Sequence, residues 1–108
     1  MAITQSTKPG DGVVRIMTGA YIDTGTVAAF TLTIGFKPKY VHIWNETSGD
    51  EEEWNENMAD AEGFKRVAAG TGALVTSNGI TPTTHGFTVG LDTDIVVTSE
   101  QLSWLAIG

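Results

Sequence analysis

The sequence predicts an all-β fold, a single-domain antiparallel β-sandwich or jelly-roll-like barrel with an extended N-terminal arm. Three observations lead to this prediction. Threonine and glycine are abundant, which favours strands joined by tight turns. Short runs of alternating apolar and polar residues recur between turn-forming residues. The chain of 108 residues has the length of one domain with one core.

The first twelve residues are polar and end in the turn-forming stretch "PGDG". We interpret residues 1–12 as an extended arm and residues 13–108 as the folded domain. An extended segment can add a strand to an exposed sheet edge of a neighbouring subunit and become ordered on docking. Ile3 and Pro9 are therefore candidate interface residues within the arm.

Two strands are expected in the segments that follow the arm, over residues 13–19 and 27–36. In the second segment, "VAAFTLTIGF", the apolar residues recur at every other position, with Thr31 and Thr33 between them. A period of two places one row of side chains on the core and the other in solvent. The inward row consists of Phe30, Leu32, Ile34 and Phe36.

The segment 37–46, "KPKYVHIWNE", is expected to be a strand with bulky residues on both faces. Pro38 opens it, where the missing N–H does least harm. Val41 and Ile43 point to one side, and the opposite side carries Tyr40, His42 and Trp44. Two bulky rows indicate that both faces are covered, one of them by a neighbouring subunit or loop. The row Tyr40, His42 and Trp44 is therefore a candidate interface.

An acidic run occupies residues 45–64 and holds eight of the thirteen carboxylates. We interpret residues 46–62 as a charged loop that faces solvent. A strand across residues 52–59 is an equally plausible alternative, whereas the apolar stripe is too thin for a stable helix. Trp54, in the middle of the run, is either an inward anchor that pins this segment or a contact residue, and it joins the candidate interface residues.

The second half of the chain is expected to consist of short strands. Segments 64–70, 85–91 and 94–98 are rich in β-prone residues. Between residues 72 and 84, Asn78-Gly79 predicts a type I′ hairpin turn, because both central positions of that turn need a positive φ. The last segment, 101–108, alternates and places Leu102, Trp104 and Ala106 on one side.

Several classes of chemistry find no support in the residues. The chain lacks cysteine, and its net charge of −7, with six scattered basic residues, argues against nucleic acid as a partner. Neither a membrane span nor a signal peptide is recognised. The acidic run lacks the spacing of a calcium loop, and two histidines, His42 and His85, are too few for a zinc site. No serine lies in a G-x-S-x-G motif, so we expect no enzyme activity, no metal and no cofactor.

Several segments together resemble small all-β structural proteins of tailed bacteriophages, of the capsid decoration, head-fibre or tail-fibre-associated type. They are "FTLTIGFKPKYVHIWNET", "EEWNENMA", "VAAGTGALVTSNGIT", "GFTVGLDTDI" and "LSWLAIG". The resemblance covers about residues 19–108 and carries no catalytic motif. It implies a virion protein present in many copies, commonly as a symmetric oligomer, with a trimer favoured.

These observations lead to one functional hypothesis and one alternative. The hypothesis is a capsid decoration, or cement, protein that lies on the capsid surface of the virion and binds the major capsid protein or another virion protein. Many symmetry-repeated weak contacts would hold such a protein on a shell. The alternative is a receptor- or carbohydrate-binding module of a tail fibre or baseplate, with Tyr40, Trp44 or Trp54 as stacking platforms.

Overall fold

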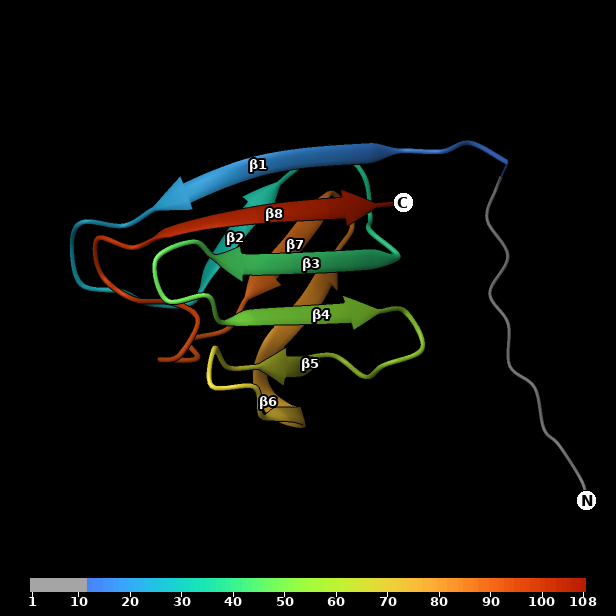
Figure 1. Ribbon diagram of the computed structural model, residues 1–108. Helices are drawn as coiled ribbons and strands as arrows, with labels where there is room; N and C mark the ends of the chain where they lie inside the picture. Colours follow the sequence, from blue (N-terminus) through green and yellow to red (C-terminus); the bar gives the residue numbers. More distant parts are fainter. Residues whose placement is uncertain (1–11) are drawn as a thin grey trace, which may run out of the picture.

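Eight antiparallel strands form one curled sheet in the computed structural model, which describes residues 12–108 (Figure 1). In chain order they are β1 (Ile16–Ile22), β2 (Phe30–Thr33), β3 (Tyr40–Asn45), β4 (Glu51–Asn55), β5 (Glu62–Arg66), β6 (Gly72–Thr83), β7 (Gly86–Val89) and β8 (Gln101–Ile107). Across the sheet their order is β1-β8-β3-β4-β5-β6-β7-β2. The first and last strands therefore lie side by side, and β1 and β2 form the two edges.

The sheet curls into a half-barrel because β6 takes part in both of its halves. Residues 72–75 of β6 pair with β5, whereas residues 80–83 pair with β7. Between these stretches Asn78 has a φ of 59°, and the N–H of Gly79 donates to the carbonyl of Ala61 at 2.9 Å. The resulting irregularity redirects β6 and separates a front layer (β1, β8, β3, β4, β5) from a rear layer (end of β6, β7, β2) that crosses behind it (Figure 1).

The hydrophobic core lies between the two layers. Phe87 of the rear layer meets Trp104 of the front layer edge to face, with ring centroids 5.5 Å apart. The buried apolar residues are Ile34, Val41, Ile43, Trp54, Ile80, Phe87, Val89, Ile95, Val96, Leu102, Trp104 and Ala106. The alternation predicted for β2, β3 and β8 is confirmed, because the expected inward row of each strand packs in or against this core.

The prediction of an all-β single domain is confirmed, but three local expectations are wrong. Asn78-Gly79 lies inside the bent strand β6 and makes no hairpin turn, because its positive φ serves the irregularity. Residues 94–98 form turns in place of a strand, and the N–H groups of Ile95 and Val96 donate to the carbonyl of Asp92. Residues 51–55 of the supposed solvated loop form β4, which is paired on both sides, with β3 and with β5.

Residues 1–11 lie outside the described part of the chain. The proposed arm over residues 1–12, and the interface roles of Ile3 and Pro9, therefore stay predictions. The description begins at Gly12, and the first strand starts four residues later at Ile16.

Candidate interaction surface

The side of the front layer that points away from the core is the candidate surface, and we call it the outer face. Strand register aligns its side chains in rows across the five strands. One row runs from Thr18 of β1 through Leu105, His42 and Glu53 to Phe64 of β5. A second row contains Ala20, Ser103, Trp44, Glu51 and Arg66. The three residues that the sequence singled out in β3, Tyr40, His42 and Trp44, all lie half-buried on this face.

Hydrogen bonds and stacking hold the three β3 side chains in one arrangement. The hydroxyl of Tyr40 donates to Oε2 of Glu53 at 2.8 Å and lies 3.0 Å from Nδ1 of His42. Because that hydroxyl has a single hydrogen, Nδ1 of His42 must be the donor in the second contact. The imidazole of His42 stacks on the indole of Trp44, with centroids 4.0 Å apart and planes 11° from parallel. Partial burial, followed by the hydrogen bond to Glu53, raises the pKa of Tyr40 to about 12.

Charged groups of β4 and β5 surround the imidazole. Nε2 of His42 lies 3.5 Å from Oε1 of Glu51 and has no hydrogen-bond partner among the described residues. Glu51 also contacts Nη1 of Arg66 at 3.3 Å. Protonation of His42 would turn the contact with Glu51 into an ion pair. The outer face therefore combines aromatic rings with carboxylates, and hydrogen bonds, stacking and an ion pair hold them in place.

Apolar side chains extend the outer face towards the edge strand β1. Leu105 and Ile107 of β8 lie beside the β3 row and are half-buried. Beyond them Ile16 is 60% exposed, and a shallow hollow lined by Val13, Val14 and Ile107 continues the apolar surface. Nothing in the described chain packs over these residues as a further layer. The candidate surface is therefore an open, mixed aromatic and aliphatic sheet face.

Trp54 does not belong to this surface. It lies on the inner side of β4 with 2% of its area exposed, and its Nε1 donates to the carbonyl of Ala59 at 3.1 Å. Of the two roles weighed for Trp54, the inward anchor is the one observed. The indole also borders a pocket of about 420 Å³ that is rimmed by charged residues, among them Lys37, Lys39 and Asp60. Because so little of Trp54 is exposed, its indole ring offers no open face to a stacked ligand.

Glu52 is a buried acid that the sequence reasoning missed. Its side chain points inward from β4 and is 1% exposed, and Oε1 has no hydrogen-bond partner within residues 12–108. Burial raises the pKa of the Glu52 carboxyl from 4.5 to about 8; the Asp92 carboxylate adds to this rise and the Lys65 ammonium opposes it. Gly63, on the neighbouring strand β5, leaves the space that the carboxyl occupies.

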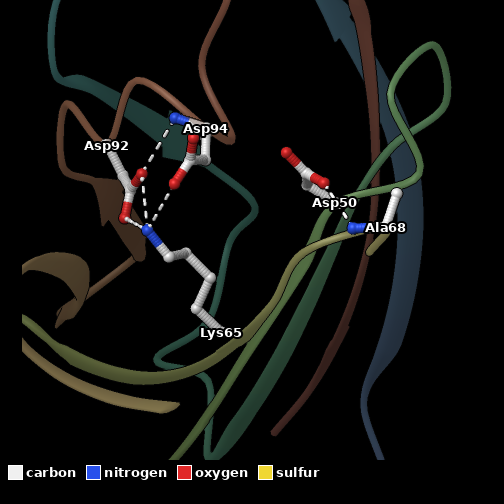
Figure 2. Close-up of polar contacts among 5 residues, drawn as sticks. All are labelled: Asp50, Lys65, Ala68, Asp92 and Asp94. Atoms are coloured by element: carbon white, nitrogen blue, oxygen red, sulfur yellow. Dashed lines mark hydrogen bonds and ion pairs between the residues drawn. The ribbon is translucent and has the colours of Figure 1, made fainter. Parts of the chain in front are cut away.

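A second group of polar contacts lies beside Glu52. It joins the loop between β7 and β8 to strand β5 of the front layer. Nζ of Lys65 lies between the carboxylates of Asp92 and Asp94, at 3.0 Å and 2.8 Å (Figure 2). In the same view, Asp50 accepts a hydrogen bond of 2.7 Å from the N–H of Ala68, which ties together the turns that precede β4 and follow β5. Side-chain burial makes the Lys65–Asp92 pair the more shielded of the two ion pairs.

The remaining expectations about chemistry concern metals and membranes. No group of three or more His, Asp or Glu side chains in the described range is placed to hold a metal ion. His85 lies in the turn between β6 and β7, where its carbonyl accepts the N–H groups of Ile34 and Gly35. Between residues 12 and 108 there is no helix that is long and apolar enough to span a bilayer.

Comparisons of the chain with known protein families, with curated proteins and with solved structures found no match. The assignment of a function therefore depends on the residues of the outer face and on the resemblance described above.

Proposed function

We propose that this protein is a structural protein of a bacteriophage virion, a capsid decoration protein that binds the major capsid protein through its outer face. The observation that carries the proposal is the row of Tyr40, His42 and Trp44, held half-buried on a sheet face over which no other part of residues 12–108 forms a further layer. A sheet face whose aromatic rings are held in place before binding loses little side-chain entropy when it docks on a partner. Aromatic residues at the centre of such a face are the usual source of binding energy.

The apolar margin supports the same role. Leu105 and Ile107 adjoin the aromatic residues, and Glu51 and Glu53 stand on the opposite side of the β3 row. An apolar centre with charged residues around it is the composition of a specific protein interface. Repeated over the copies on a shell, contacts of modest strength would give a high overall avidity.

A charge at Leu105, in the apolar part of the outer face, is expected to weaken capsid binding. In Leu105→Glu, a second carboxylate would enter the row that already holds Glu53, and docking would bury it without a partner. We expect the affinity for capsids that lack this protein to fall roughly tenfold or more, because central interface residues have effects of that size. Co-sedimentation of the variant with such capsids measures the change.

The matched control is Thr33→Glu, which adds the same charge to an exposed position of β2 in the rear layer. It should bind capsids as the native protein does, and circular dichroism should show both variants folded. Equal binding by Leu105→Glu and the native protein would reject the outer face as the docking surface. Density for this chain at the tail tip, and none on the head, in a reconstruction of the particle would reject the decoration role.

The alternative of a receptor- or carbohydrate-binding module now depends on Trp44 and Tyr40, since Trp54 is buried. The half-buried indole of Trp44 is the observation that keeps this alternative open, because a tryptophan ring on a sheet face can stack on a sugar. Binding to a glycan array that is lost in Trp44→Ala, together with unaltered capsid binding by that variant, would favour the tail-fibre role.

A further inference from the structure

One side of the edge strand β1 is unpaired among residues 12–108. Most edge strands carry features that protect such a side, and β1 lacks several of them. Among residues 12–108 it pairs with β8 alone (Figure 1). The register with β8 has no bulge over all seven residues. The strand contains no charged residue and no proline. Proteins commonly protect an exposed edge with charges, prolines, bulges or a short strand, because a bare edge pairs with other chains. The opposite edge, β2, has only four residues.

The backbone groups on this free side can be identified from the adjoining ladder. Arg15 and Gly108 exchange both of their backbone hydrogen bonds, at 3.2 Å and 2.8 Å. Hydrogen-bonded pairs alternate in an antiparallel ladder, so residues 17, 19 and 21 also bond to β8. The N–H and C=O groups of residues 16, 18, 20 and 22 therefore point away from β8, and no backbone group of another described residue bonds to them.

We propose that β1 is the docking site of a second copy of this chain, with the two β1 strands paired antiparallel about a twofold axis at Gly19. In this register the residues with outward-pointing backbone groups bond to each other. Ile16 stands opposite Ile22 of the second copy, and Thr18 opposite Ala20. Every outward-pointing backbone group of the seven-residue strand then has a partner, and one sheet runs through both copies.

The side chains at both ends of the strand fit the same register. Ile16 is 60% exposed and Ile22 is 53% exposed, and pairing brings these two β-branched side chains together twice. One step further out, Arg15 of one copy faces Asp23 of the other. The carboxylate of Asp23 is held in place by the hydroxyl of Tyr21 at 3.2 Å and the N–H of Gly25 at 2.8 Å. Two opposite-charge pairs therefore flank an apolar centre.

Charge also favours this edge over other surfaces for a contact between two copies. Each chain has a net charge of −7, so two copies repel each other over most approaches. Neither β1 nor β8 contains a charged residue. Six of the thirteen carboxylates lie in residues 51–62, on or after β4, which β8 and β3 separate from β1. The contact is independent of the proposed capsid role, and its twofold symmetry differs from the trimer that the sequence resemblance implies.

The mass of the full chain in solution tests the proposal. Sedimentation equilibrium over rising protein concentration should approach twice the chain mass of 11.5 kDa. Thr18→Pro removes an N–H that points to the free side and should give a monomer whose circular dichroism spectrum shows that it is folded. The control Thr26→Pro changes an exposed residue of the β1–β2 loop and should stay dimeric. A monomer at all concentrations, a mass of three chains, or a folded Thr18→Pro dimer would overturn the proposal.

Introduced cysteines test the register without depending on the fold of the proline variant. The chain has no native cysteine, so added thiols report only on the contact. Directly opposed Cα atoms in a hydrogen-bonded pair lie about 5.5 Å apart, within disulfide range. Thr18→Cys mixed with Ala20→Cys should therefore form a disulfide-linked heterodimer. Cross-linking of either variant with itself, in preference to the mixture, would overturn the register, because those residues would lie on a longer diagonal.

Discussion

Replacing Glu52 by glutamine is expected to abolish most of the loss of stability that the native protein undergoes as the pH rises from about 4.5 to about 8. The folded protein keeps this carboxyl protonated up to a pKa of about 8, whereas the unfolded chain releases the proton near 4.5. Between these values the unfolded state binds fewer protons, so the free energy of unfolding falls as the pH rises. The protein is most stable below the lower value, and the loss is complete above the upper one.

The size of this effect follows from the shift. A rise from 4.5 to about 8 sets an upper limit of about 5 kcal/mol, because one pKa unit corresponds to about 1.4 kcal/mol. Urea unfolding of the native protein and of Glu52→Gln should therefore give similar free energies near pH 4 and a more stable variant at pH 8. A smaller difference of the same sign would indicate that water reaches the buried carboxyl in the folded protein.

Asp60→Asn is the matched control, because it also converts a carboxyl of the acidic run into an amide but at an exposed position. It should leave the difference in stability between pH 4 and pH 8 close to that of the native protein. Parallel pH profiles of the native protein and Glu52→Gln would show that Glu52 does not hold its proton in the folded state.

The fold could be predicted largely because the alternating segments are strong local signals. The segments 27–36, 37–46 and 101–108 each have a period of two, and within them lie the strands β2 (Phe30–Thr33), β3 (Tyr40–Asn45) and β8 (Gln101–Ile107). One row of apolar side chains in each segment packs in or against the core. The row of Tyr40, His42 and Trp44 followed from the same period of two. These features depend on neighbours in sequence, which a single chain displays directly.

The acidic run shows why the rest could not be predicted. Its composition indicates a solvated segment, yet pairing with β3 and β5 turns Glu51–Asn55 into a central strand. Once that strand exists, the period of two places Glu52 on the same inner side as Trp54. Glu52 and Trp54 are two residues apart, so an inward Trp54 in a strand would have predicted an inward Glu52. Only the pairing with β3 and β5, however, decides that the segment is a strand. Likewise, Asn78-Gly79 indicates a positive φ without indicating whether a hairpin or an irregular strand uses it.

Asn45→Ala is expected to destabilise the protein by about 3 kcal/mol, because several groups would lose their partner in a buried site. The Asn45 side chain, in a residue 1% exposed at the end of β3, makes four hydrogen bonds of 2.9 Å each. Its Oδ1 accepts the N–H groups of Thr47 and Ser48, and its Nδ2 donates to the carbonyl of Ile95 and to Glu100. Asn45 thereby joins the turn before β4 to the loop before β8.

Thermal unfolding of the two alanine variants Asn45→Ala and Asn57→Ala measures this contribution. Asn57 is an exposed asparagine of the same acidic run, and its replacement should change stability by no more than about 0.5 kcal/mol. Asn45→Ala should lower the melting temperature by roughly 12–20 °C in a domain of this size.

Asn45→Asp adds a test of polarity: it keeps the acceptor for Thr47 and Ser48 but sets a carboxylate oxygen against the Ile95 carbonyl and the Glu100 carboxylate. That variant should therefore be less stable than the native protein at pH 7 and recover part of the loss at pH 4, where a protonated carboxyl can donate. Equal melting temperatures for Asn45→Ala and Asn57→Ala would mean that the buried amide does not hold the two loops together.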